Sequence, residues 1–209
     1  MSAPVTRPAP RVPWQIKFAL LSLIWGASFL FMMVGLRALY PLQISSLRIL
    51  AGSFVLLLVM AASKTKLPSH ARTWGHIVIT AALLCAIPFT LFAMGEERVT
   101  SGLAGIGNAV TPAATVVFTL LLLPAQRPAA SQLLGVVGGF LGVVVIMAPW
   151  NSAAAPDALG FGMVLMAASC YGLGWVYTRR YLTSVDRGGL ALPTAQLLVA
   201  SVEVTAAEV

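Results

Sequence analysis

The chain has 209 residues, of which 59% are hydrophobic and 9% are charged, and its formal net charge is +7. A soluble domain carries about 25% charged residues, so this composition excludes a soluble globular protein and indicates a polytopic protein of the lipid bilayer. The basic residues lie mostly in short gaps between apolar segments, without interleaved aromatic residues, which excludes a nucleic-acid-binding face.

Six apolar segments follow in chain order, each close to the ~20 residues that a helix needs to cross ~30 Å of hydrocarbon. They predict spanning helices over residues 14–36, 44–62, 75–95, 103–123, 133–149 and 159–177. The predicted fold class is therefore all-α, a polytopic transmembrane helical bundle. The first segment is too long for a removable signal peptide, and the Pro- and Ala-rich residues 1–13 before it predict a disordered cytoplasmic tail.

A seventh apolar segment begins near Leu190 but stops short. About a dozen largely apolar residues precede Glu203, fewer than the ~20 that a span requires, and Glu208 follows. A carboxylate is costly in hydrocarbon. The sequence therefore predicts an incomplete seventh helix that is frayed or lies at the membrane interface.

The distribution of basic residues indicates the orientation of the helices, because Lys and Arg in short loops resist translocation. With the N-terminus inside, ten of the thirteen basic residues fall on the inner side, and Glu96, Glu97 and Asp157 fall outside. The ten are Arg7, Arg11, Lys17, Lys64, Lys66, Arg72, Arg127, Arg179, Arg180 and Arg187. This pattern predicts a multi-pass protein of the plasma membrane with a cytoplasmic N-terminus.

The fourth apolar segment carries a stripe of polar side chains at helical spacing. Asn108, Thr111, Thr115 and Thr119 lie around Pro112. Lipid cannot provide hydrogen bonds to these groups, so they face either another helix or a wet cavity that lines a route for a polar solute. The two readings are compatible, and the sequence leaves both open.

Prolines and glycines indicate where the helices bend and where they pack. Pro88 and Pro112 each remove a backbone donor, so each predicts a helix kink and a wall of a cavity. The fifth segment has overlapping G-x-x-x-G spacings, which favour close helix contact within the chain or between two chains. Its glycines are Gly135, Gly138, Gly139 and Gly142.

Two further side chains are candidate substrate contacts. Trp25, Phe29 and Met32 share one face of the first helix, either as a packing or lipid-facing stripe or as an aromatic wall for an organic solute. Arg48 is a basic residue within an apolar segment, so it either snorkels to the outer interface or reaches inward to an anionic group or a helix C-terminus.

The sequence lacks the residue patterns of catalytic and metal sites. No intramembrane nucleophile–base pair, H-E-x-x-H motif or phosphate-binding glycine loop is present, so we predict no enzyme and no cofactor. His70 and His76 have no further ligand at suitable spacing, which argues against a metal. Cys85 and Cys170 lie in apolar segments and are expected to pack as small hydrophobes.

Several segments together resemble the EamA-like members of the drug/metabolite transporter superfamily. TSGLAGIGNAVTPAATVVFTLLLL (100–123) and QLLGVVGGFLGVVVIMAP (132–149) are similar to that family's fourth and fifth helices. LIWGASFLF around Trp25 and ISSLRILAG with Arg48 are similar to its first and second helices. Gln126 stands where the family usually has a glutamate.

The resemblance implies a secondary transporter that exports small metabolites or drugs across the cytoplasmic membrane by alternating access. Family members resemble two inverted five-helix repeats, so residues 14–149 correspond to the first repeat and 150–209 to the truncated start of a second. The candidate substrate-binding residues are Trp25, Arg48, Asn108, Thr111 and Thr115. A homodimer would supply two half-routes, and the alternative is a non-transporting membrane scaffold or an inactive carrier fragment.

Overall fold

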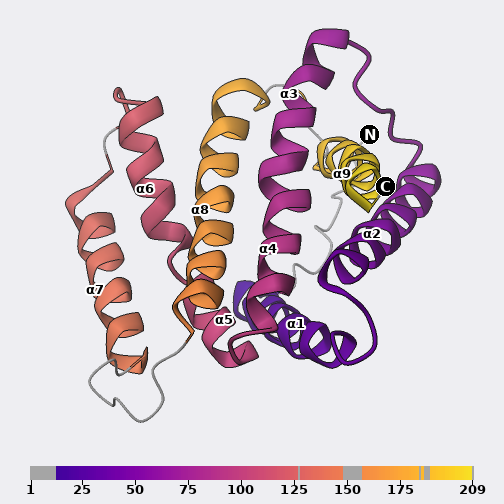
Figure 1. The fold of residues 1–209 in the computed structure, drawn as a ribbon. Helices are drawn as coiled ribbons and strands as arrows, with labels where there is room; N and C mark the ends of the chain where they lie inside the picture. Colours follow the sequence, from indigo (N-terminus) through magenta and orange to yellow (C-terminus); the bar gives the residue numbers. More distant parts are fainter. Residues whose placement is uncertain (1–12, 127, 148–156, 184, 186–188, 209) are drawn as a thin grey trace, which may run out of the picture.

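The structure is a computed structural model that describes residues 13–126, 128–147, 157–183, 185 and 189–208. Within these ranges the chain is all-helical, as predicted (Figure 1). The elements are α1 Trp14–Gly35, α2 Pro41–Ser63, α3 Ala71–Ala81, the π-helix η1 Ala82–Ala86, α4 Ile87–Glu96, α5 Ser101–Asn108, α6 Thr111–Leu122, α7 Ala130–Met147, α8 Ala158–Tyr181 and α9 Ala191–Glu208. Residues 1–12 of the expected tail lie outside the described residues.

Five helical segments in the described part of the chain are long and apolar enough to cross a membrane. They are Trp14–Gly35, Pro41–Ser63, Ala71–Glu96, Ser101–Leu122 and Ala158–Tyr181. A sixth apolar helix is shorter, with its apolar part at Ala130–Gly142 in α7, and the last two residues of the predicted span 133–149 lie outside the described residues. The multi-pass helical bundle that the sequence predicts is thus confirmed.

The prediction of a frayed or interface-lying C-terminal segment is wrong. Residues Ala191–Glu208 form a continuous helix, α9, that packs against α2, α3 and η1. Ala195 and Ala200 are completely buried, and Ser46 donates a hydrogen bond of 2.6 Å to Glu208 Oε1. Counting apolar residues underestimated this helix because its small side chains bury themselves against neighbouring helices instead of facing lipid.

The third and fourth spans are each interrupted near a proline. Ala71–Glu96 contains η1, and Pro88 stands at the start of the α-helix that resumes after it. Ser101–Leu122 breaks at Ala109 and Val110, and α6 resumes with Pro112 in its first turn. Proline lacks a backbone donor and is best accommodated in a first helical turn, which accounts for where both helices restart.

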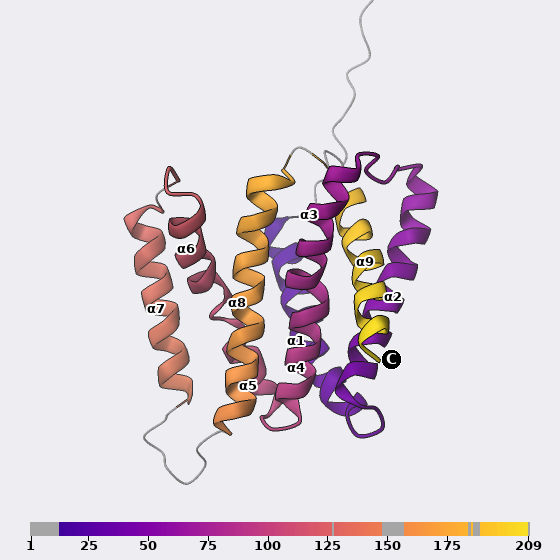
Figure 2. The ribbon, with the colours of Figure 1, turned by 45° about the horizontal axis from the view of Figure 1, so that its top comes forward.

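Helix α8 occupies the middle of the bundle and packs against α4 and α6. Figure 2 shows α7 at one edge of the bundle and α2 at the other. The α8–α6 contact is close because Gly172 has no side chain: a Cβ there would lie 2.8 Å from the backbone N of Thr115. Gly172 therefore positions α6, which carries the threonines of the polar stripe, against the middle of the bundle.

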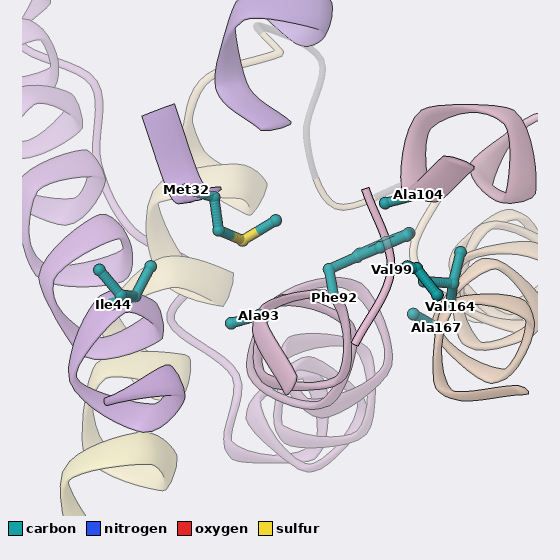
Figure 3. Close-up of a cluster of buried hydrophobic side chains, with 8 residues drawn as sticks. All are labelled: Met32, Ile44, Phe92, Ala93, Val99, Ala104, Val164 and Ala167. Carbon is teal, nitrogen blue, oxygen red and sulfur yellow. The ribbon is translucent and has the colours of Figure 1, made fainter. Parts of the chain in front are cut away.

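The largest buried apolar cluster joins five helices at one end of the bundle. Met32, Ile44, Phe92, Ala93, Val99, Ala104, Val164 and Ala167 form this cluster (Figure 3). The outward faces of α1, α2 and α7 carry many exposed large apolar side chains, among them Phe31, Phe54 and Leu134. Such surfaces are matched to hydrocarbon, so these faces are the ones that lipid covers.

Candidate functional site

A cavity of about 260 Å³ brings together three of the predicted substrate contacts, Trp25, Arg48 and Asn108. We call it the Arg48 cavity. Its lining residues are Ile24, Trp25, Ser28, Phe29, Arg48, Phe89, Phe92, Asn108 and Tyr171. They come from α1, α2, α4, α5 and α8, so residues far apart in the sequence build one site.

Arg48 points into the bundle, which is the inward of the two orientations that the sequence left open. Its Nη2 donates a hydrogen bond of 2.8 Å to Ser28 Oγ, and its Nη1 lies 3.1 Å from Met32 Sδ. The guanidinium carbon lies 4.5 Å from the centre of the Phe89 ring, a cation–π distance. Three uncharged groups thus hold the guanidinium at the cavity wall.

The rest of the polar stripe lines a second, larger cavity of about 800 Å³ between α6, α7 and α8. We call it the threonine cavity. Its lining includes Thr111, Thr115 and Thr119, with Gln126 and Arg179 at the loop after α6 and the end of α8. The predicted site is therefore divided: Thr111 and Thr115 do not share the cavity of Trp25 and Arg48.

The stripe satisfies its hydrogen bonds within its own segment. Thr111 Oγ1 donates to Asn108 Oδ1 at 3.1 Å, across the break between α5 and α6. Thr115 donates to the carbonyl of Thr111 at 2.8 Å, and Thr119 donates to that of Thr115 at 2.7 Å. In the described residues the stripe therefore makes no hydrogen bond to a neighbouring helix, and its hydroxyl groups lie along a cavity wall.

Among the described residues, the glycines of α7 do not make a close intrachain contact, which was one of the two readings of their spacing. A Cβ at Gly135, Gly138, Gly139 or Gly142 would meet no atom within 4 Å. Gly135 and Gly139 instead line the threonine cavity. In the described structure a Cβ would come within 3 Å of a neighbouring atom at Gly35, Gly95, Gly107, Gly160, Gly172 and Gly174. The sequence could not separate these two sets because G-x-x-x-G spacing does not specify which helix, if any, lies opposite.

Glu96, which the charge pattern places on the outer side of the membrane, is a buried residue. The residue ends α4 and is only 5% exposed, and neither carboxyl oxygen has a hydrogen-bond partner. It interacts electrostatically with Arg48 without forming an ion pair. Burying a carboxyl without a hydrogen-bond donor lowers the stability of the fold. Because Glu96 interacts electrostatically with Arg48, we count it among the surroundings of the site.

Other functional chemistry is sparse in the described part of the chain. Those residues contain no group of three or more His, Cys, Asp or Glu that could hold a metal ion. His76 instead contacts Tyr177 at 2.9 Å and stacks on Tyr181. Cys85 and Cys170 are free thiols.

The comparison with known families decides the assignment. The sequence model of the EamA-like transporter family matches residues 12–148, which is well over half of the chain. The chain belongs to the EamA-like transporter family. It is a multi-pass membrane protein of a transporter family, which is not an enzyme family. The matched region contains the whole polar stripe and all the lining residues of the Arg48 cavity except Tyr171.

Curated relatives agree with this family. The chain is 32% identical to Protein PagO of Salmonella typhimurium over 54% of this chain and 37% of that protein. It is 25% identical to the uncharacterized inner membrane transporter YedA of Escherichia coli, over 87% of this chain and 57% of the relative. It is also 25% identical to the uncharacterized transporter YvbV of Bacillus subtilis, over 92% of this chain and 62% of that protein. The chain thus spans less than two thirds of each relative, and no solved structure matches it significantly.

Sequence reasoning missed several members of this EamA-like site. Ser28 and Phe89 hold the guanidinium, and Tyr171 closes the cavity from α8. Ser28 lies within the LIWGASFLF segment, three residues after Trp25, so helical spacing from Trp25 was a signal that could have found it. Phe89 and Tyr171 had no signal, because an aromatic residue in an apolar helix is indistinguishable from ordinary packing.

Proposed function

We propose that the chain acts in secondary transport, exporting a small organic solute across the cytoplasmic membrane by alternating access. In this proposal Trp25, Arg48 and Asn108 contact the solute in the Arg48 cavity. Thr111 and Thr115 contact it in the threonine cavity. Membership of a transporter family and two cavities whose linings include polar side chains support the proposal.

The hydrogen bond between Asn108 and Thr111 is the observation that carries the proposal. Asn108 lines the Arg48 cavity and Thr111 lines the threonine cavity, so this hydrogen bond joins a residue of one cavity to a residue of the other within one membrane-spanning segment. The helix is broken there, at Ala109 and Val110. Carriers typically form solute sites at such discontinuous helices, where non-helical backbone lines a cavity and can change conformation.

The test is efflux from cells that produce the Asn108→Leu variant. Asn108→Leu replaces an amide that lines the Arg48 cavity with an apolar side chain of similar size. We expect it to abolish export of whichever solute in a metabolite panel the unmodified chain moves, measured with and without a proton gradient. Val117→Leu is the control, because Val117 is 53% exposed in the same membrane-spanning segment and lines neither cavity. Unchanged export by folded Asn108→Leu protein would contradict the proposal.

We also propose that the N-terminus is cytoplasmic and that two copies of the chain act together. Pairing would give the two opposed halves that alternating access requires, and the open glycine face of α7 supports a contact between copies. Crosslinking of a single-cysteine variant at Gly138 in membranes tests this contact. A scaffold that does not transport is the competing proposal, and it predicts that no solute in the panel moves in any variant.

A further inference from the structure

We propose that the Arg48 cavity selects solutes that carry a single carboxylate. This inference rests on the proposed transport function and adds the substrate class to it. It depends on the charge, the size and the lining of the cavity, each of which constrains the occupant separately.

The first constraint is the charge on Arg48. A guanidinium stays protonated in proteins and presents five N–H donors. Only two of these donors have contacts in the described residues: one donates to the Ser28 hydroxyl, and the other donates to the thioether of Met32, which is a weak acceptor. Arg48 forms no ion pair with any described residue. The ion pair found in the described part of the chain joins Arg98 to Asp157. Donors therefore remain for a solute anion.

Glu96 is the acidic side chain that faces Arg48 electrostatically, and it does not neutralise the site by contact. Its two carboxyl oxygens have no hydrogen-bond partner, and it lies outside the lining of the cavity. An incoming carboxylate therefore meets the guanidinium directly, without Glu96 in the lining. Arg and carboxylate form paired, planar hydrogen bonds, so a carboxylate fits the open side of one guanidinium.

The second constraint is size. A cavity of about 260 Å³ lies just below the ~300 to 1,000 Å³ typical of drug-sized ligands. One guanidinium in an otherwise uncharged lining balances one negative charge. A phosphate monoester carries about 1.5 to 2 negative charges at pH 7. The cavity therefore favours a monocarboxylate with few other heavy atoms over a sugar phosphate or a nucleotide.

The third constraint is the remaining lining. Trp25, Phe29 and Phe92 provide aromatic surface for an apolar body, with the Phe29 and Phe92 rings edge to face at 5.3 Å. Asn108 accepts from Thr111 through Oδ1, which leaves the Nδ2 donors without a partner among the described residues. A second oxygen of the solute can accept from this amide. The complementary solute has a carboxylate at one end and an apolar group within reach of Trp25.

The experiment measures binding to the purified full chain in detergent micelles. The probes are two acid–amide pairs of nearly equal size, phenylacetate with phenylacetamide and hexanoate with hexanamide. We expect the unmodified chain to bind each acid at least about tenfold more tightly than its amide, which corresponds to ~1.4 kcal/mol. Arg48→Gln should remove this preference, and Arg48→Lys, which keeps the charge but loses the planar fork, should retain part of it. Arg37→Gln is the matched control because Arg37 is exposed and lines neither cavity.

Three results would overturn the inference: equal binding of acid and amide, a preference that survives Arg48→Gln, or no binding of either acid. Circular dichroism and Arg48→Lys separate a folding defect in Arg48→Gln from a lost contact. Efflux measurements separate this inference from the proposed function. If the chain exports neutral solutes and Arg48→Gln does not alter that export, the proposed substrate class is wrong and the proposed transport function stands. If the chain binds the acids but exports no solute, the carboxylate site stands and the transport function is wrong.

Discussion

Arg48 and Ser28 are joined by a hydrogen bond of 2.8 Å between Nη2 and Oγ, which links α2 to α1 at the wall of the Arg48 cavity. The two residues are 20 apart in the sequence. α1 has few other buried contacts, since most of its side chains face outward. This bond therefore both positions the guanidinium and attaches α1 to the bundle.

Removing the Ser28 hydroxyl should loosen this attachment. We expect Ser28→Ala to lower the free energy of unfolding by about 1.5 to 3 kcal/mol, because a half-buried hydrogen bond to a charged group is lost. Chemical denaturation in micelles measures the change. Ser22→Ala is the control: Ser22 also lies on α1, but it is exposed and bonds only to the carbonyl of Phe18. Equal effects of the two substitutions would contradict a role for Ser28 in holding α1.

Gly172 should be intolerant of any side chain. A Cβ at Gly172 would lie 2.7 Å from Ala114 Cβ and 2.8 Å from Thr115 N. We therefore expect Gly172→Ala to destabilise the fold by about 1 to 3 kcal/mol through overpacking. Gly162→Ala on the same helix meets nothing within 4 Å and should raise stability by up to ~1 kcal/mol through helix propensity. Thermal unfolding of the pair measures the contrast, and a stabilised Gly172→Ala variant would exclude the close α6–α8 contact.

Asp157 should give the start of α8 a pH-dependent stability. Its carboxylate accepts a 2.7 Å hydrogen bond from the backbone N of Gly160, which is the main reason that its pKa lies below the ordinary value; Arg98, at 3.5 Å, lowers the pKa further. Because the folded pKa is lowered, the stabilisation is complete above the ordinary pKa of about 3.9 and disappears as pH falls through the lowered value.

The matching experiment compares unfolding of Asp157→Ala with the unmodified chain from pH 7 to pH 3. The variant should be less stable at pH 7, and the difference should shrink below about pH 4. Asp157→Asn keeps a good N-cap without the charge, so its stability relative to Asp157→Ala should not vary over this range. A difference that stays constant down to pH 3 would show that the Asp157 carboxylate does not stabilise α8.

The docking of α9 is testable with one buried and one exposed position. Ala200 is completely buried beside α2 and η1, so Ala200→Leu should destabilise by about 1 to 3 kcal/mol. Val202→Leu, at a side chain that is 69% exposed, should change stability by less than about 0.5 kcal/mol. Proteolysis of the C-terminal segment provides a second readout. Equal tolerance at both positions would support the frayed helix that the sequence predicted.

Hydropathy was sufficient to predict most of the fold. The predicted spans 14–36 and 159–177 fall within a few residues of α1 and α8, because lipid imposes both length and composition on a spanning helix. α9 was misjudged because it is buried through Ala and Thr side chains that contribute little hydropathy. Breaks near Pro88 and Pro112 were predictable from proline chemistry, whereas the π-helix η1 was not.

The candidate site was predictable only in part. Trp25, Arg48 and Asn108 stood out as polar or aromatic side chains in apolar segments, and the described structure brings them to one cavity. Thr111 and Thr115 were grouped with them by helical spacing, but the break after Asn108 turns them to the threonine cavity. The charge pattern placed Glu96 on the outer side of the membrane but gave no signal that tertiary packing buries the side chain.

The central claim is that the polar stripe faces water inside the bundle. The most direct measurement is the reaction of single cysteines at Asn108, Thr115 and Val117 with a charged, membrane-impermeant thiol reagent, in a background where Cys85 and Cys170 are alanine. The two cavity positions should react, and Val117, which faces outward in the apolar surface, should not. If cysteines at Asn108 and Thr115 are as unreactive as the one at Val117, the stripe is dry and the transport route does not exist.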